Sequence, residues 1–151
     1  MPPLECRKLS SEWKRQLLEF FCDIQEAGYV KYFHPHPFTA KEIEKLIQYD
    51  GKDLYYILVE GERILGYAML RGWDEGYEIP SLGIVIHPSI AGTGIGKVFM
   101  HFLHATAKRQ GATKIRLKVY PDNIRALKMY KALNYKFQPE EGGQLLGIVK
   151  L

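Results

Sequence analysis

The run LGIVIHPSIAGTGIG, residues 82–96, constrains the fold more than any other stretch of the chain. Its first five residues predict a strand. Three glycines on alternate positions follow, and an amphipathic helical pattern begins at Ile95. Glycine lets backbone N–H groups face a ligand, and a helix N-terminus adds roughly half a positive charge. This order of strand, glycine loop and helix therefore predicts a seat for phosphate or pyrophosphate.

The spacing of these glycines excludes two common phosphate-binding loops. A P-loop requires G-x-x-x-x-G-K-S/T, but Val98 follows Gly96 and Lys97, and Ala91 stands at the first glycine position. The dinucleotide fingerprint G-x-G-x-x-G would need a glycine at Lys97. It also needs an acidic residue about twenty positions further on, where this chain has none.

A third glycine pattern, Q/R-x-x-G-x-G/A, is met at Gly94 and Gly96 and missed at Ala91. A second segment, VYPDNIRALKMYKALNY at residues 119–135, follows the predicted helix. It is similar to V-x-x-x-N-x-x-A-x-x-L/M-Y-x-x-x-G-F/Y, and three of its residues fall in register: Asn123, Ala126 and Tyr130. Asn134 replaces the glycine of that pattern, and asparagine also tolerates the left-handed end of a helix.

With these two motifs in this order, residues 54–150 resemble the GNAT family of N-acetyltransferases. The resemblance implies transfer of an acetyl group from acetyl-CoA to the primary amine of a small molecule, such as an amino sugar, by direct attack in a ternary complex. A protein N-terminal or lysine acetyltransferase is an alternative. A non-catalytic acyl-CoA-binding module is a third reading, although it would not need Tyr130.

The resemblance also implies where acetyl-CoA binds. The strand before the glycine loop and the strand after its helix splay apart in this family, and the pantetheine arm pairs with the first of them. Asn123 is expected to reach this arm and to cap its own helix. The residues expected to bind acetyl-CoA are Ile84, Val85, Ile86, Ala91, Gly92, Thr93, Gly94, Ile95, Gly96, Lys97, Asn123, Ala126 and Tyr130. Lys97 and the Thr93 hydroxyl are the nearest substitutes for the polar side chain that Ala91 lacks.

Acetyl transfer requires a neutral amine, a stabilised oxyanion and a proton for the departing thiolate. Tyr130 is predicted to supply this proton, because a phenol near pKa 10 can protonate a thiolate. The alternative role for Tyr130 is to anchor its helix in the core. A backbone N–H near Val85 or Ile86 is expected to bind the oxyanion.

The general base has several candidates. Glu78 is the only acid on the expected central strand, and its parity matches that of Leu82. It could equally be a solvated residue at the strand start. Asp74 and Glu75, in the preceding loop, are further candidates.

The acceptor pocket is expected to use aromatic residues of two loops. Prolines stiffen the segment His34–Phe38, which can present two imidazoles or pack as a rigid loop. The second loop holds Trp73 between two glycines. The predicted acceptor-binding residues are His34, His36, Phe38 and Trp73.

The remaining histidines are not expected to take part in the reaction. His87 is expected to have a structural role. His101 and His104 lie one turn apart but have no third ligand in view, so no metal is expected.

Length and composition indicate one globular domain over residues 1–151, with 46% hydrophobic residues. The net charge of +4 and the pI near 9.0 are modest, and no basic stripe indicates nucleic acid. Cys6 and Cys22 show no metal or disulfide pattern. No secretory leader or membrane-spanning run is recognised, which favours the cytoplasm. A monomer or homodimer is expected, with an amine acceptor as its partner and no nucleic acid or membrane.

The order of elements predicts an α/β fold with a mixed, mostly antiparallel sheet of about six to seven strands and about four flanking helices. The resemblance implies that this is a GNAT-like fold with a splayed strand pair at the cofactor site. Strands are expected over residues 4–9, 54–60, 64–70, 77–86, 114–120, 135–138 and 145–150. Helices are expected from residue 10 or 11 to 27, over 39–49, from 95 to the glycine at 111, and over 123–133.

Overall fold

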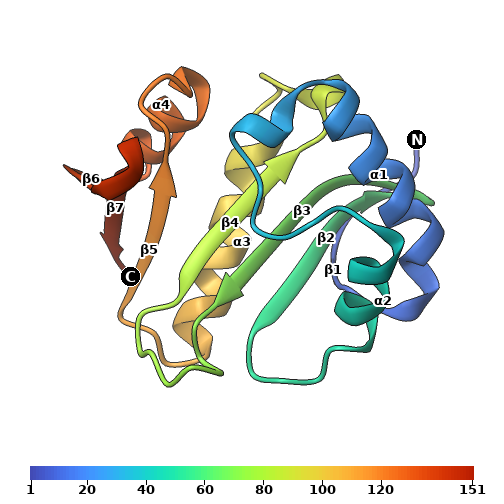
Figure 1. The fold of residues 1–151 in the computed structure, drawn as a ribbon, viewed down its shortest axis with the longest axis horizontal. Coiled ribbons are helices and arrows are strands. Elements are labelled where there is room, and N and C mark those ends of the chain that lie inside the picture. The colour runs from blue at the N-terminus through green and yellow to red at the C-terminus, as the bar shows by residue number, and fades with distance from the viewer.

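A computed structural model describes residues 1–151, except for the side chain of Glu141. Seven strands form one sheet in the order β1-β2-β3-β4-β5-β7-β6 (Figure 1). The strands are β1 (Leu4–Lys8), β2 (Leu54–Glu60), β3 (Arg63–Arg71), β4 (Ser81–Ile86), β5 (Lys114–Val119), β6 (Lys136–Pro139) and β7 (Leu145–Lys150). The helices are α1 (Lys14–Glu26), α2 (Ala40–Gln48), α3 (Ile95–Arg109) and α4 (Ile124–Ala132), with short 3-10 turns η1 (Ser11–Trp13), η2 (Tyr29–Lys31), η3 (Pro88–Ile90) and η4 (Glu141–Gly143). The predicted fold class is confirmed.

Local sequence signals account for most of the helix ends. The Thr39 hydroxyl accepts a hydrogen bond from the Glu42 N–H at 3.2 Å and so caps the start of α2, and the run TAKE at residues 39–42 has the spacing of a capping box. Asn134 has φ 72° just after α4, and Gly111 has φ 94° just after α3. Both residues take the left-handed conformation that ends a helix.

The predicted start of the central strand is wrong, because β4 begins at Ser81 and not at residue 77. The preceding loop is held as a turn by Asp53, a carboxylate only 8% exposed. Asp53 Oδ1 accepts from the backbone N–H groups of three residues, at 3.0, 2.9 and 3.3 Å: Gly72, Trp73 and Asp74. Glu78, expected on the strand, therefore lies in a bend before it, and the residue is exposed.

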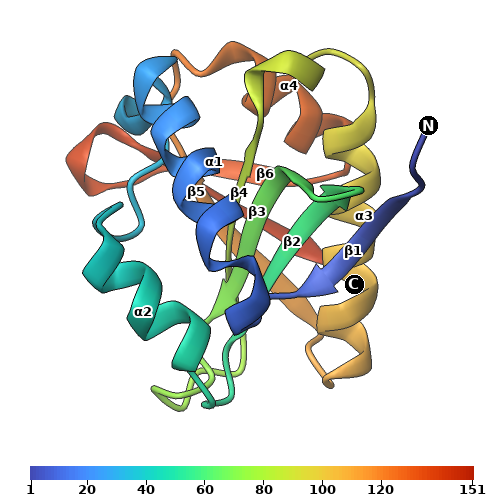
Figure 2. The same ribbon diagram turned by 90° about the vertical axis from the view of Figure 1, so that its right-hand side faces the viewer.

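Helices cover the two faces of the sheet unequally. On one face, α3 and α4 pack on a core that includes Phe99, Leu103 and Tyr130 and extends to β5 and β7. On the other face, α1 and α2 pack on β2, β3 and β4 (Figure 2). The buried core under α1 and α2 contains no residue of β5, β6 or β7 among those that the structure describes.

The sheet opens between β4 and β5, which form its parallel pair. Their register has a single bridge, Ser81 to Arg116, supported by a 3.0 Å hydrogen bond from the Arg116 N–H to the Pro80 carbonyl. Beyond this bridge the two strands diverge toward the glycine loop (Figure 1). The predicted splayed pair is therefore present. Within the described residues, no helix is long and apolar enough to cross a bilayer.

Candidate active site

Unpaired backbone groups of β4 line the opening. The His87 N–H donates to the Leu65 carbonyl at 2.8 Å, and the β3–β4 register continues from that pair without a break. Hydrogen-bonded pairs alternate in an antiparallel ladder, so Val85 pairs with Tyr67 of β3. Ile84 and Ile86 consequently turn their N–H and C=O groups toward the opening, where no bridge to β5 meets them. Ile86, rather than Val85, is left with an open N–H.

The glycine loop brings further unpaired donors to the end of β4. Gly92 and Gly94 have φ 77° and 85°, and a Cβ added at either would meet no atom within 4 Å. Gly94 is the N-cap residue of α3, and no side chain caps this helix. The first-turn N–H groups of α3 therefore lack partners within the helix. Together with the helix dipole, they suit a pyrophosphate.

Gly96 allows the start of α3 to approach both walls of the opening. A Cβ added there would lie 3.4 Å from Ile86 Cγ1 and 3.5 Å from Met129 Sδ. Two predicted polar contributors stand close by. Thr93 Oγ1 already donates to the Ile90 carbonyl at 2.6 Å, so its proton is used inside the loop. Lys97 is exposed in the first turn of α3 and lines a groove along that helix.

The second motif places its three residues on α4, across the opening from β4. Asn123 is half-buried at the N-cap position, but its side chain makes no capping hydrogen bond, so the predicted cap is wrong. Among the described residues, its side-chain amide does not bond to the helix that it precedes. Ala126 packs against the core beside α4. Tyr130 is 7% exposed, and burial alone raises the pKa of its hydroxyl, which stays protonated at neutral pH.

The loop between α1 and α2 crosses to the end of β5. His34 is exposed, and its Nε2 lies 3.0 Å from the Tyr120 hydroxyl. Two residues earlier, the Tyr32 hydroxyl lies 3.2 Å from Asp122 Oδ2. These contacts place His34 beside the opening, on the face of the sheet that carries α1 and α2.

His36, by contrast, is turned into the aromatic core. Its Nε2 lies 2.8 Å from the hydroxyl of the buried Tyr67, and its ring packs against Phe21 and Phe38. Burial lowers the pKa of His36, which favours the neutral imidazole. His36 and Phe38 thus brace the loop that positions His34.

Four other candidates lie at the opposite end of β4. The six residues of β4 span about 17 Å, and Trp73, Asp74, Glu75 and Glu78 precede the strand. Trp73 packs against the core beneath α3. The Tyr49 hydroxyl and the Lys52 N–H donate to Asp74, and the bond from Tyr49 lowers the pKa of the Asp74 carboxyl. The structure therefore does not bring these residues together with Tyr130 and His34.

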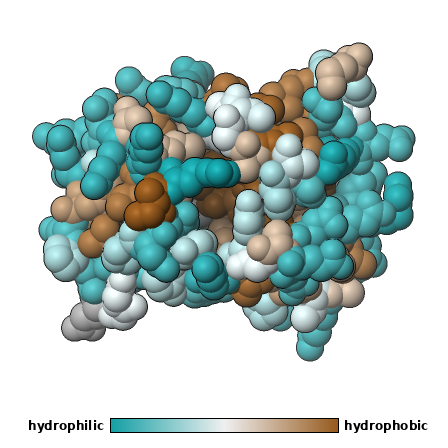
Figure 3. Space-filling view, turned by 90° about the horizontal axis from the view of Figure 1, so that it is seen from above, coloured by the Kyte–Doolittle hydropathy of each residue, from teal (hydrophilic) through white to brown (hydrophobic). Residues whose placement is uncertain are grey.

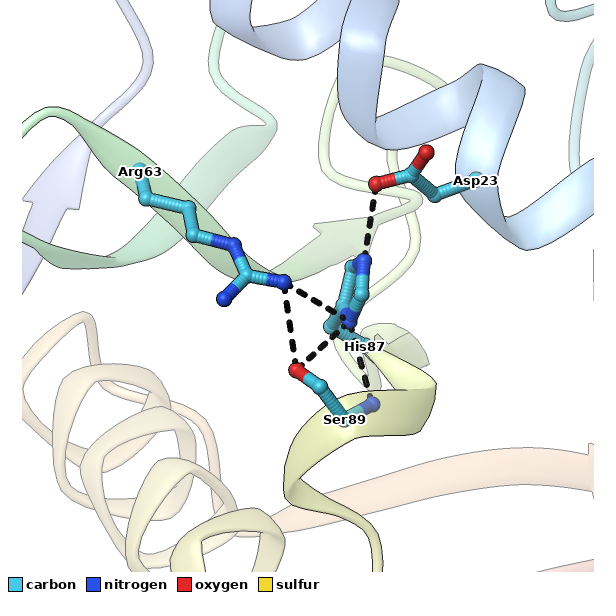
Figure 4. A network of polar contacts seen from close by, with 4 residues as sticks. All are labelled: Asp23, Arg63, His87 and Ser89. Atoms are coloured by element: carbon cyan, nitrogen blue, oxygen red, sulfur yellow. Dashed lines mark hydrogen bonds and ion pairs between the residues drawn. The ribbon is translucent and has the colours of Figure 1, made fainter.

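His87 anchors the start of the glycine loop, in the structural role predicted for it. The residue is 8% exposed, and its Nδ1 accepts from the Ser89 N–H at 3.1 Å. This leaves Nε2 to donate to Asp23 Oδ2 at 2.8 Å (Figure 4). Arg63 completes the network with a 3.3 Å hydrogen bond to Ser89 Oγ. Elements far apart in sequence, α1 and the β2–β3 hairpin, are thereby tied to the end of β4.

The other histidine pair, His101 and His104, has no third metal ligand among the residues that the structure describes. His104 Nε2 lies 2.7 Å from the Tyr135 hydroxyl, and its ring centroid is 6.5 Å from that of His101. Burial, and to a lesser degree His101, lowers the pKa of His104. No group of three His, Cys, Asp or Glu side chains suited to a metal occurs among the described residues.

The end of the molecule that holds the glycine loop is hollowed. Figure 3 views it from above and shows hydrophobic surface in a depression between two mostly hydrophilic rims. Unpaired strand amides and a glycine loop suited to an anion therefore lie at this end of the molecule, and Tyr130 belongs to the core beside α4.

Comparison with known proteins agrees with this geometry. Residues 18–135 match the model of the acetyltransferase (GNAT) family. An N-acetyltransferase of Mycobacterium tuberculosis is 40% identical over 75 residues, which cover 49% of this chain and 47% of that protein. The chain thus matches about half the length of such relatives.

Solved structures share the whole fold at low sequence identity. A PaiA N-acetyltransferase of Thermoplasma acidophilum, solved in complex with coenzyme A, has a TM-score of 0.80 and 20% identity, and 99% of each chain is covered. A ribosomal-protein-S5-alanine acetyltransferase of Vibrio fischeri has a TM-score of 0.80 and 15% identity, with 99% of this chain and 94% of that one covered. The chain belongs to the GNAT acetyltransferase family.

Proposed function

We propose that this protein is an acetyl-CoA-dependent N-acetyltransferase that acts on a primary amine. The observation that carries the proposal is the pair of open residues on β4, Ile84 and Ile86, beside a glycine seat at the start of α3. An extended amide-bearing ligand would add to this strand edge while its pyrophosphate binds the helix N-terminus.

The residues at the opening divide the binding of acetyl-CoA between them. The glycine loop and the first turn of α3 would hold the pyrophosphate, with Lys97 adding a positive charge. Ile84 and the carbonyl of Ile86 would pair with the pantetheine amides, and the side-chain amide of Asn123 would bind the same arm from α4. Acetyl-CoA supplies an acetyl group activated as a thioester.

Two groups of the chain would stabilise the transfer. The N–H of Ile86 faces the opening and would bind the developing oxyanion. Tyr130 would donate its proton to the leaving thiolate. Burial raises the pKa of Tyr130, which makes the free phenol a weaker acid. The same apolar surroundings would raise the proton affinity of a thiolate beside it, so the two groups stay matched.

His34 is the best-placed general base. It borders the opening at the end of β5, whereas Glu78 lies at the far end of β4. Its contact with the Tyr120 hydroxyl would orient the imidazole toward an incoming ammonium group.

The acceptor can be a small-molecule amine, as the sequence analysis expects, or the amine of a polypeptide. The sheet beside His34 carries no covering helix, and this observation favours a polypeptide over a small molecule in a closed pocket. The neighbour from Vibrio fischeri acetylates the alanine of a ribosomal protein, which is in line with this choice.

Incubation with acetyl-CoA and a panel of amines tests the function. The panel would hold amino sugars, polyamines and short peptides with free N-termini or lysines, with release of free thiol as the readout. We expect thiol release that depends on the amine and is absent without it. Binding of acetyl-CoA without transfer to any amine would favour the non-catalytic acyl-CoA-binding module.

A further inference from the structure

One half of the sheet has an uncovered face. Alternate residues of β5 (Ile115, Leu117 and Val119) point into the core beneath α3. The residues between them therefore point to the opposite face, where α1 and α2 cover only the β2–β4 half (Figure 1). This second set consists of Lys114, Arg116, Lys118 and Tyr120.

Cross-strand register extends this face over β7 and β6. Arg116 lies opposite Ile148, and Lys118 lies opposite Leu146. Residues directly opposite each other share a face of the sheet. Ile148 and Leu146 are each half-buried, and neither belongs to either hydrophobic core. The open face, as we name it, comprises Lys114, Arg116, Lys118, Lys136, Gln138, Leu146, Ile148 and Lys150.

The open face is strongly basic. It carries five Lys or Arg side chains and no acid, and none of the five forms an ion pair with the side chains that the structure describes. Positive charge is also unevenly distributed along the whole chain. Residues 112–151 contain eight Lys or Arg and three Asp or Glu, a net charge of +5. Residues 1–111 contain thirteen Lys or Arg and fourteen Asp or Glu, a net charge of −1. The excess positive charge of the chain therefore comes from residues 112–151.

Arg116 contributes an unsatisfied hydrogen-bond donor to this face. The residue is half-buried, and its Nε–H is buried without a hydrogen-bond partner among the described residues. Such groups in native proteins are usually paired, and a guanidinium pairs best with a carboxylate. Acetyl-CoA bound at the glycine loop would not supply an acceptor for this N–H, because α3 and α4 lie on the opposite side of the sheet.

We propose that the open face binds an acidic polypeptide segment that carries the acceptor amine, with a carboxylate of the segment on Arg116. The inference rests on the proposed N-acetyltransferase function and adds its substrate class. Together with Tyr120 at its end, the open face runs about 20 Å along β5 from Lys114 and about 10 Å across three strands. A single small amine would contact only part of this area, whereas an extended peptide fits its length.

The position of the face sets the register of such a segment. The amine would enter beside the hydrogen-bonded pair of His34 and Tyr120, at the end of β5 nearest the opening. Arg116 lies four residues back along β5, about 13 Å away. An extended chain covers that distance in about four residues, so the carboxylate on Arg116 would lie about four residues from the acetylated amine.

Fluorescence anisotropy tests the binding with two ten-residue peptides, labelled at the C-terminus. One has a free N-terminal alanine and glutamates at positions three to six, and the other has glutamines there. We expect the acidic peptide to bind at least tenfold more tightly, with affinity falling as salt rises. Arg116→Gln and Lys118→Gln should each weaken its binding at least fivefold. Lys131→Gln, an exposed change on α4, is the matched control and should leave it unchanged.

Three results would overturn the proposal: equal binding of the two peptides, equal loss in the Lys131 variant, and equally tight binding of an oligonucleotide with the same charge. Lys118 is exposed, so its variant remains informative if the change at Arg116 disturbs folding. Calorimetry with acetyl-CoA distinguishes failure of the acidic-acceptor proposal from failure of the proposed N-acetyltransferase function. Unchanged acetyl-CoA binding in both variants, with no preference for the acidic peptide, would reject the acidic acceptor alone. Absence of acetyl-CoA binding in the unmodified protein would reject the proposed function.

Discussion

His87 and Asp23 are 64 residues apart in the chain, yet His87 Nε2 lies 2.8 Å from Asp23 Oδ2. The pair joins the last turn of the molecule's first long helix, α1, to the residue that leads into the glycine loop (Figure 4). The loop itself makes few contacts, since a Cβ added at Gly92 or Gly94 would meet open space. The His87 anchor therefore holds the anion seat in place relative to β4.

Loss of this anchor should destabilise the fold. Asp23→Ala leaves the His87 Nε2–H without its partner in a residue that is only 8% exposed. We expect the free energy of unfolding to fall by about 1–2 kcal/mol in urea titrations, the cost of an unpaired buried donor. Glu26→Ala removes an exposed carboxylate from the same helix and should change stability little. Equal effects of the two changes would show that the hydrogen bond between His87 and Asp23 contributes nothing.

Removal of the Tyr130 hydroxyl should affect catalysis and spare binding. Tyr130→Phe should lower turnover about a hundredfold or more with acetyl-CoA affinity nearly unchanged, because the hydroxyl acts only on the leaving thiolate. Tyr135→Phe is a suitable control, since the Tyr135 ring lies 5.7 Å from that of Tyr130 but its hydroxyl contacts His104. Normal turnover in Tyr130→Phe would assign the tyrosine to the core.

The burial of Tyr130 should also affect how turnover depends on pH. Because burial raises the pKa of Tyr130 above the usual value, the phenol remains protonated throughout neutral and mildly alkaline solution. The wild-type rate should therefore show no falling limb up to about pH 10, the ordinary pKa of tyrosine. A steady-state profile with a decline near pH 8 that is absent in Tyr130→Phe would contradict this expectation.

The general base can be identified from the rising limb of the same profile. An amine arrives as an ammonium ion, so the rate should rise with pH as the base loses its own proton. If His34 is the base, the limb should vanish in His34→Gln and survive in Glu78→Gln. The reverse pattern would restore Glu78 to the role that sequence parity suggested. A limb unchanged in both variants would mean that the acceptor ionises before it binds.

Lys97 should contribute to the binding of the donor, since Ala91 supplies no polar side chain to the glycine loop. Lys97→Ala should weaken acetyl-CoA binding by about 1–2 kcal/mol in calorimetry, as expected for one charge-assisted contact. Lys108 lines the same groove three turns further along α3, so Lys108→Ala controls for overall charge. Equal losses from both variants would indicate a general electrostatic effect.

Much of this fold can be predicted because its signals are local. The capping pattern at Thr39 and the left-handed residue at Asn134 depend on neighbours within one helical turn. The glycine loop is equally local, since its φ angles demand glycine wherever the chain turns this way. Residue type and spacing are sufficient for features of this kind.

Other features depend on contacts that no spacing encodes. Asp53 holds the loop before β4 from about twenty residues away, so the pattern around Glu78 looked like strand. His34 and His36 are two residues apart in a symmetrical segment, and only tertiary packing turns His36 onto Tyr67 and leaves His34 at the opening. The basic row on β5 is visible as an alternation, but the sequence does not reveal which face of the sheet lacks a helix.

The most direct test of the donor site is amide hydrogen exchange at β4, followed by NMR with and without saturating acetyl-CoA. In the free protein, the Ile84 and Ile86 amides should exchange rapidly because they face the opening, whereas Val85 is protected by its pairing with Tyr67. Acetyl-CoA should slow exchange at Ile84 and Ile86 and leave Val85 nearly unchanged. Exchange at Ile84 and Ile86 that is unaffected by acetyl-CoA would contradict the assignment of this opening as the donor site.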